Sequence, residues 1–343
     1  MPVSRARSRT RVTIDEVARR AGVSISTVSR VLNQTAGVTE EASARVLAVV
    51  AELGYVPQTA ARHLAQGKTN TLGLLLPDIG TDFFSPLLRS ISAAAAETGY
   101  DLLIAIQRHA EGLAPPRQPI GKHNTDGLLV FNNSHSDAEL RHFHQLGFPA
   151  VLLYRSAPVG TAFPSITIEN KAGARQIVDH LIEVHGRRRI AFLRGPASNE
   201  DSLWRERGYR EGLAAHAIPF DPALVGDGEF YDEPARATVE RWLATGLEFD
   251  AIFAGDDGSA VGALAALVQA GRRVPEDVAL AGFDDDPMVR YLVPPLTTVR
   301  APTELVGREA VQQLIRLIKT GRARSITLLP TEPVIRRSCG CGQ

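Results

Sequence analysis

The chain begins with a segment whose apolar residues recur at helical spacing. Ile14, Val17 and Ala18 fall at positions i, i+3 and i+4, which places them on one face of a helix. Thr13 and Glu16 match a capping box, in which each side chain bonds the backbone N–H of the other residue. The pattern predicts a helix that begins directly after Thr13.

A tight turn is predicted to separate this helix from a second one. Gly22 can end the first helix because glycine tolerates a positive φ. Ser24 can cap the second helix, whose apolar positions are Val28, Val31 and Leu32. Two short helices joined by a three-residue turn that contains glycine are the helix-turn-helix signature.

A third helix is predicted between Thr39 and Gly54, with Val46, Val50 and Leu53 on its buried face. In such a head the second helix enters the DNA major groove by its N-terminal end. The residues on its outward face are Ile25, Ser26, Thr27, Ser29 and Arg30. An alternative is a three-helix bundle that contacts only protein, but the outward face has no apolar stripe to support it.

From residue 71 onward, short apolar runs alternate with helical stretches. The strand-like runs are Leu72–Leu76, Leu102–Ile106, Gly127–Phe131, Ala150–Leu153, Ile166–Ile168, Ile190–Leu193, Ala251–Ala254 and Val278–Ala281. The helical stretches include Pro86–Glu97, Ala172–Glu183, Arg205–Ala215 and Ser259–Ala270. This alternation is typical of parallel sheets covered on both faces, with too many strands for one compact open sheet. We therefore predict an all-α helix-turn-helix head followed by an α/β core of two doubly wound parallel-sheet lobes.

Length and charge agree with this division. A chain of 343 residues suggests two or three domains. Residues 1–68 hold ten Lys/Arg against five Asp/Glu, so the other 275 residues carry the compensating excess of five acids. A basic head on an acidic body indicates that the head contacts a polyanion. No apolar run is long enough for a membrane helix and no secretory signal is recognisable, so we expect a cytoplasmic protein without membrane contact.

Two cysteines, Cys339 and Cys341, lie close to the C-terminus. A lone C-x-C is a weak framework for a disulfide or for zinc, because structural zinc takes four ligands. We expect a pair of inert thiols in a tail over 339–343, and neither a metal nor a cofactor.

The head resembles one known family closely. The sequence VTIDEVARRAGVSISTVSRVLN over 12–33, followed by GYVP over 54–57, is similar to the DNA-binding head of the lac repressor (LacI/GalR) family. The resemblance extends over nearly the whole chain. It implies that Ile25, Ser26, Ser29 and Arg30 face the operator and that Asn33 ends the recognition helix. The full set of expected DNA-binding residues is Thr13, Ser24, Ile25, Ser26, Thr27, Ser29, Arg30, Asn33, Arg62 and Leu64.

The resemblance also implies a hinge helix over 59–68, in which Leu64 wedges into the central base step of the minor groove. Leu64 could instead be a linker leucine packed on the core. The expected domains are a disordered basic arm (1–10), the head (11–58), the hinge (59–68) and a core (69–338) like periplasmic binding proteins. The N-lobe is expected to span about 69–168 and 299–328, and the C-lobe about 169–298 and 329–338.

Doubly wound sheets bind ligands beyond the carboxyl ends of their strands. The residues predicted there are Asp78, Asn132, Tyr154, Arg194, Asp256 and Asp284. The resemblance adds Arg205, which fixes effectors in the family, and Phe230, which stacks on them; Phe83 completes the expected set. Tyr154 and Asp256 stand where many sugar-binding members have aspartate and asparagine. A pocket that contains Asp256, Asp284 and one arginine favours a sugar, polyol or nucleoside over an anion.

We therefore predict a repressor that binds a pseudopalindromic operator as a homodimer and responds to a small effector. A coiled-coil heptad run that would make a tetramer is absent from the C-terminus. One alternative is a periplasmic-type solute-binding protein, whose lobes would look the same. Another is an enzyme, but the dinucleotide and phosphate loops are missing, and His142 and His144 point to different helix faces.

Overall fold

The structure is a computed structural model that describes residues 12–32, 37–55, 68–107 and 120–342. The chain divides into two compact units, Met1–Thr69 and Asn70–Gln343, and each is described by itself. The basic arm, nearly all of the hinge and the predicted DNA contacts Asn33, Arg62 and Leu64 lie outside the described residues.

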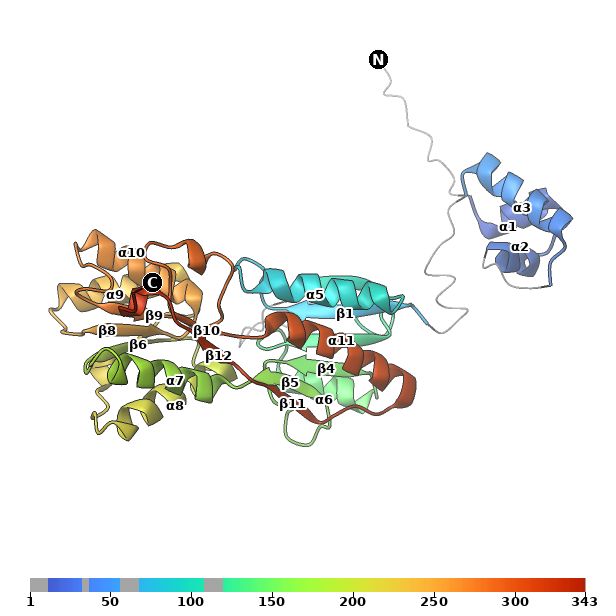
Figure 1. The fold of residues 1–343 in the computed structure, drawn as a ribbon. Coiled ribbons are helices and arrows are strands. Elements are labelled where there is room, and N and C mark those ends of the chain that lie inside the picture. Colours follow the sequence, from blue (N-terminus) through green and yellow to red (C-terminus); the bar gives the residue numbers. More distant parts are fainter. Residues whose placement is uncertain (1–11, 33–36, 56–67, 108–119, 343) are drawn as a thin grey trace, which may run out of the picture. The chain divides into compact units, whose positions relative to one another are not determined.

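The first unit contains three helices, α1 (Ile14–Ala21), α2 (Ile25–Leu32) and α3 (Glu40–Leu53) (Figure 1). The hydroxyls of Thr13 and Thr39 cap α1 and α3 by accepting a backbone N–H three residues further on, at 3.4 and 3.3 Å. Gly22 and Gly54 end these two helices with φ of 66° and 58°, where a side chain would be strained. The predicted helix-turn-helix is confirmed.

The core of this head is small. Val17, Val28 and Val46, one from each helix, are fully buried and pack together. Val50 and Leu53, which were predicted to be buried, are only half-buried against this core. The reason is size, because a head of three short helices has a large surface for its volume.

The first lobe of the second unit, called the N-lobe, is built on a parallel sheet in the order β11-β5-β4-β3-β1-β2. Its strands are β1 (Thr71–Leu76), β2 (Asp101–Ile106), β3 (Gly127–Phe131), β4 (Ala150–Leu153), β5 (Ser165–Ile168) and β11 (Ile326–Leu329). One face packs on α5 (Phe84–Glu97) and α11 (Thr303–Thr320), and the other packs on α6 (Asp137–Gln145). Successive residues such as Leu74 and Leu75 therefore enter opposite cores, which explains the continuous apolar runs.

The second lobe, called the C-lobe, repeats this plan with a parallel sheet in the order β7-β6-β8-β9. Its strands are β6 (Ile190–Arg194), β7 (Val225–Asp227), β8 (Ala251–Ala254) and β9 (Ala279–Ala281). Helices α7 (Asn170–Glu183) and α8 (Glu200–Ala215) cover one face, and α9 (Asp232–Ala244) and α10 (Asp257–Gln269) cover the other. The prediction of two doubly wound lobes is confirmed.

The chain passes between the two sheets three times. It leaves the N-lobe after β5, returns through β10 (Thr298–Arg300) into α11, and crosses back from β11 through β12 (Glu332–Val334). β10 and β12 pair antiparallel in a short ribbon between the lobes (Figure 1). β7, β10, β11 and β12 were not predicted, because three or four partly exposed residues give too short a pattern.

Three 3₁₀ turns complete the C-lobe: η1 (Pro222–Leu224), η2 (Val289–Tyr291) and η3 (Arg337–Cys339). The last of them packs Cys339 into the core, where it is fully buried. Among the described residues, no helix is both long enough and apolar enough to span a membrane.

Candidate DNA-reading helix and inter-lobe binding site

The N-terminal end of α2 presents a cluster of hydroxyl groups. Ser24 Oγ accepts the N–H of Thr27 at 3.2 Å and also lies 2.7 Å from Ser26 Oγ and 2.9 Å from Thr27 Oγ1. Ser24 is therefore a helix cap, as its sequence position indicates. Ile25 next to it is 46% exposed, although it is a large apolar residue.

Charge on the head is distributed unevenly. Three of its arginines lie within salt-bridge distance of glutamates, in the pairs Arg19–Glu16, Arg20–Glu52 and Arg45–Glu41. Arg30 on α2 is exposed, and no acidic side chain pairs with it within the described part of the head. The unneutralised charge and the exposed Ile25 thus lie on the helix that was predicted to read DNA, together with Ser26, Ser29 and the cap.

In the core unit, the predicted residues Arg205 and Asp284 form a buried ion pair. Arg205 Nη2 lies 2.9 Å from Asp284 Oδ1, and the two side chains are only 3% and 7% exposed. A second guanidinium nitrogen donates to the carbonyl of Gly255 at 2.6 Å. The planar guanidinium group of Arg205 is therefore held by hydrogen bonds to Asp284 and Gly255 of the C-lobe itself.

A longer polar network continues from this pair. Arg205 Nε donates to Asn170 Oδ1 at 2.9 Å, and Asn170 Nδ2 donates to Asp201 Oδ1 at 2.7 Å. Sequence reasoning missed Asn170 and Asp201. Asn170 is the first residue of α7 and Asp201 lies in the first turn of α8, positions that sequence patterns explain equally well as helix starts.

Two aromatic rings lie close to the guanidinium of Arg205. Its guanidinium carbon lies 3.8 Å from the ring centre of Phe283 and 5.5 Å from that of Phe230. The Phe230 ring lies against Gly195, where a Cβ would come within 2.6 Å of three ring atoms. Glycine at that position lets the ring approach the backbone after β6.

The N-lobe side of the site has a different character. Tyr154 directly follows β4 and is fully buried, with its ring centre 5.5 Å from that of Phe83 and 5.1 Å from that of Phe131. Within the described residues, its hydroxyl makes no hydrogen bond of good geometry, and neither does the Nδ2 of buried Asn132. Burial raises the pKa of the Tyr154 phenol, although the Thr303 side chain is close enough to lower it somewhat. Two predicted residues thus carry the unpaired polar atoms expected of a binding site.

A hydrogen bond joins the lobes directly. Tyr231 donates its hydroxyl to Asp78 Oδ2 at 2.6 Å, while Asp78 Oδ1 accepts the backbone N–H groups of Ile79 and Gly80 at 2.6 and 2.8 Å. A second bridge runs from Ser156 of the N-lobe to Glu200 of the C-lobe at 2.9 Å. Sequence reasoning found Asp78 and missed Tyr231, which is the neighbour of the predicted Phe230.

Asp256 has a structural role that its sequence pattern did not reveal. Its two carboxylate oxygens accept the N–H groups of Ser259 and Gly258 at 3.1 and 3.0 Å and cap α10. Burial raises its pKa, and these hydrogen bonds oppose the rise. Asp256 therefore caps α10, and this position also brings its carboxyl group close to Asp284.

Several carboxyl groups near Arg205 are hard to ionise. Burial raises the pKa of Asp284 to about 7, because lost solvation and nearby Asp256 outweigh the attraction of Arg205. Burial raises the pKa of Asp201 to about 6 and, with Asp284 and Asp256 adding repulsion, that of Asp286 to about 8. One guanidinium thus faces a surplus of acidic groups.

The structure brings together Asp284, Arg205, Phe230 and Asp256 on the C-lobe, and Tyr154 with Phe83 on the N-lobe. The charges of Arg205 and Asp284 act on the pKa of Tyr154, so these residues lie on facing parts of the two lobes and make up the candidate site. Arg194 lies apart, because it pairs with Asp227 on the neighbouring strand at 2.6 Å.

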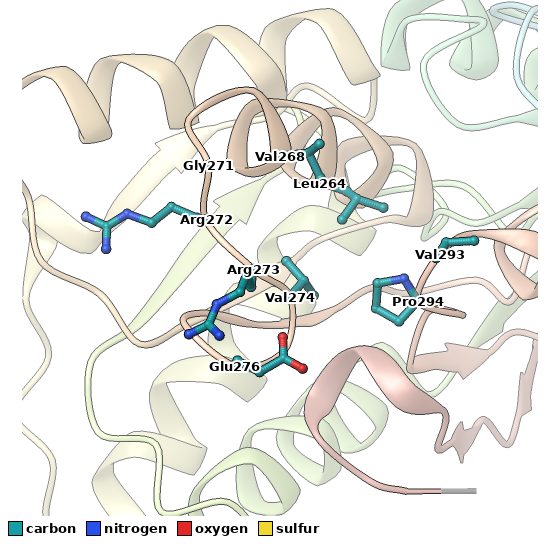
Figure 2. Close-up of a pocket in the computed structure, with 9 residues that line it drawn as sticks. All are labelled: Leu264, Val268, Gly271, Arg272, Arg273, Val274, Glu276, Val293 and Pro294. Atoms are coloured by element: carbon teal, nitrogen blue, oxygen red, sulfur yellow. The ribbon is translucent and has the colours of Figure 1, made fainter.

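A hollow of about 410 Å³ lies elsewhere in the C-lobe (Figure 2). It is lined by Leu264, Val268, Gly271, Arg272, Arg273, Val274, Glu276, Val293 and Pro294. Much of this lining precedes β9, so it lies at the amino end of that strand, opposite the edge where doubly wound sheets bind ligands. None of the predicted effector residues lines it, and we place the candidate site between the lobes.

Comparison with known protein families gives two matches. Residues 13–58 match the family described as bacterial regulatory proteins, lacI family, and residues 178–339 match the periplasmic binding protein-like domain. The first match covers α1 to α3, and the second covers most of the C-lobe, α11, β11 and the end of the chain.

Curated relatives and solved structures match over nearly the whole length. The chain is 34% identical to the HTH-type transcriptional regulator CelR of Thermobifida fusca over 342 residues, covering 96% of this chain and 99% of that one. It is 33% identical to the ribose operon repressor of Halalkalibacterium halodurans, covering 96% and 98%. A structure of the lac repressor dimer bound to operator and the anti-inducer ONPF superposes with a TM-score of 0.80 at 26% identity, covering 96% and 99%.

Proposed function

Because the chain belongs to the LacI family of bacterial transcription regulators, we propose that a neutral, hydroxyl-rich effector binds between the lobes of its core and controls its affinity for DNA. The observation that carries this proposal is that Tyr154 Oη and Asn132 Nδ2 are two of the five buried side-chain atoms without a hydrogen-bond partner in the described part of the chain. Each buried donor left unpaired costs about 1–3 kcal/mol, which a ligand oxygen would recover.

The charges of the site favour a neutral ligand over an anion. Arg205 is already paired with Asp284, and Asp201, Asp256 and Asp286 surround the pair. An anion would meet no unpaired cation among these groups and would repel every carboxyl that ionises, whereas sugar, polyol or nucleoside hydroxyls can bond to the carboxyl groups and accept from Tyr154. Relatives point the same way, since one is named for the ribose operon and a CelR structure at 30% identity and TM-score 0.70 is a complex with cellobiose.

Coupling to DNA would run through the contacts between the lobes. The Tyr231–Asp78 and Ser156–Glu200 hydrogen bonds hold one relative arrangement of the lobes. An effector that binds another arrangement more tightly shifts the equilibrium toward it, and operator affinity changes by the same coupling energy, typically 1–3 kcal/mol. A homodimer on a pseudopalindromic operator is the assembly we propose, since two-fold symmetry then relates the two heads to the two half-sites. We propose no catalytic step.

A ligand screen tests the effector proposal. Thermal unfolding of the full-length chain is measured with neutral sugars, polyols, nucleosides and their phosphorylated counterparts, each with and without operator DNA. A neutral compound should raise the melting temperature, and Tyr154→Phe should bind it about tenfold more weakly, which is one hydrogen bond. Tyr291→Phe is the matched control, because Tyr291 is 73% exposed. Stabilisation by anions alone would overturn the proposal.

A second experiment tests the assignment of α2. The operator is first selected from random duplexes with the wild-type chain, and affinity is then measured for Arg30→Ala and for the control Arg45→Ala on α3. Loss of a bidentate contact to guanine costs about 1–3 kcal/mol and relaxes the preference at one base pair. If Arg45→Ala weakens binding as much as Arg30→Ala, α2 is not the reading helix.

A further inference from the structure

Four side chains with strong metal-ligand chemistry converge in the C-lobe, away from the inter-lobe site. They are His180, His185, Cys339 and Cys341, and the ligand atoms that they offer all lie within 4.8 Å of one another. His180 and His185 come from the end of α7 and the residue just beyond its C-cap, whereas the cysteines come from η3 and the residues after it. The two pairs are more than 150 residues apart in sequence.

The backbone turns these residues toward one another. Gly340, between the cysteines, has a φ of 111°, a conformation that other residues rarely adopt. A Cβ on Gly340 would come 3.0 Å from Nδ1 of His185, so the backbone passes close to that ring. The two imidazole rings meet nearly edge to face, with centres 5.1 Å apart.

Three of the six distances between the ligand atoms match the edges of a tetrahedron around a zinc ion, and the others are no longer than 4.8 Å. Nε2 of His180 lies 3.5 Å from Cys339 Sγ and 3.7 Å from Cys341 Sγ, and Nε2 of His185 lies 3.4 Å from Cys341 Sγ. Zinc–sulfur bonds of about 2.3 Å and zinc–nitrogen bonds of about 2.05 Å at the tetrahedral angle separate S and N by about 3.6 Å. All three contacts fall close to this value.

We propose that these four residues form a Cys₂His₂ site for Zn²⁺, which ties the C-terminal end of the chain to the end of α7. Thiolate and imidazole are ligands that Zn²⁺ prefers, and four protein ligands leave no open position, so the site is structural. The histidine spacing H-x₄-H lies within the range of known zinc sites, whereas C-x-C is one residue shorter than usual. The positive φ of Gly340 is the feature that lets the shorter loop turn.

Surrounding contacts already hold the first cysteine in place. Ser338 Oγ donates to the carbonyl of Leu280 at 2.6 Å and accepts the N–H of Thr297 at 2.7 Å. The Thr297 hydroxyl lies 3.1 Å from Cys339 Sγ. The segment before the site is thus anchored to β9, and the metal has to order only the last residues. The sequence predicted inert thiols because a C-x-C pair alone is a weak zinc framework. No sequence pattern connects the two cysteines to His180 and His185.

Metal binding is tested on the full-length chain, purified without a histidine tag and under reducing conditions. One equivalent of Co²⁺ should give the intense visible bands of a tetrahedral site with thiolate charge transfer, and one equivalent of Zn²⁺ should abolish them. Cys341→Ser and His185→Gln should each weaken Zn²⁺ binding by more than about 100-fold, since even loss of a second-shell partner costs 10–100-fold. His144→Gln, an exposed histidine on α6, is the control and should bind as the wild type does.

Three results would overturn the site. The first is a Co²⁺ spectrum of octahedral type, or none, from a chain that is folded by circular dichroism. The second is unchanged affinity in both ligand variants. The third is a Cys339–Cys341 disulfide that persists under reduction and excludes the metal, which mass spectrometry detects as the loss of two hydrogens. Cys341 is only half-buried, so its serine variant is expected to fold.

Discussion

The two walls of the inter-lobe site differ in how their polar groups are satisfied. On the C-lobe, Arg205 has partners at Asp284, Asn170 and Gly255, all from the C-lobe itself. On the N-lobe, Tyr154, which packs against aromatic rings, and Asn132 each keep a buried atom that has no hydrogen-bond partner among the described residues. The C-lobe wall is therefore preorganised by its own charges, and under the proposed function a ligand would complete the N-lobe wall. On that basis we expect substitutions on the C-lobe wall to change stability most, and those on the N-lobe wall to change effector affinity most.

The largest change in stability is expected when the positive charge at the centre of the C-lobe wall is removed. Arg205→Ala should lower the free energy of unfolding by about 3–5 kcal/mol, because Asp284 is left buried without its partner. Chemical denaturation measures the change. Arg205→Met combined with Asp284→Asn should recover much of the loss, since both charges are then gone. A single variant within 1 kcal/mol of the wild type would show that the C-lobe wall is not held by this pair.

The acidic surplus on the same wall predicts a dependence on pH. The pKa of Asp284 is raised to about 7, above its ordinary value near 4, so the folded state holds more protons than the unfolded state between these values. The free energy of unfolding should therefore fall as pH rises from 4 to 7, by up to about 1.4 kcal/mol per pH unit for one group. Asp201 and Asp286, with pKa values of about 6 and 8, act in the same direction.

Denaturation curves taken at several pH values test this sign. Asp284→Asn should flatten the slope between pH 4 and 7. Asp277→Asn is the control, because Arg273 lowers the pKa of Asp277 and its contribution is lost only toward acid pH. A wild-type stability that rises between pH 4 and 7 would contradict the prediction.

The sequence predicted the strands of the lobes more accurately than the side-chain contacts between different elements. The bounds of β3 and β4 matched because every residue in them is buried, so the apolar run and the strand coincide. Arg205 and Asp284 were both named, but their pairing across 79 residues follows from the fold and from no local pattern. Asp256 shows a different difficulty. An Asp before a helix gives a clear local signal, but that signal fits a helix cap and a ligand-binding residue equally well.

The hydrogen bond between the walls is the next test. Tyr231→Phe removes the donor to Asp78 and should lower the free energy of unfolding by about 1 kcal/mol. Because the bond favours one arrangement of the lobes, the variant should also change the affinities for effector and for operator. If both ligands prefer the same arrangement, the two affinities change in the same direction. If they prefer different arrangements, one affinity rises and the other falls. Titration of both ligands measures the two changes. If stability falls while both affinities stay constant, the bond stabilises the fold without contributing to coupling.

The smallest effect is expected at Asp256, which belongs to the charged wall but acts through a helix cap. Asp256→Asn keeps a side-chain oxygen for one of the N–H groups of α10 and removes a buried charge, and Asn caps helices about as well as Asp. The free energy of unfolding should therefore change by less than about 0.5 kcal/mol, whereas Asp256→Ala should lose about 1 kcal/mol. Effector affinity separates the remaining roles. If Asp256 accepts a ligand hydroxyl, the asparagine variant weakens binding while the fold stays intact. If affinity is also unchanged, Asp256 only caps α10, and the C-lobe wall reaches the effector through Arg205 and Asp284 alone.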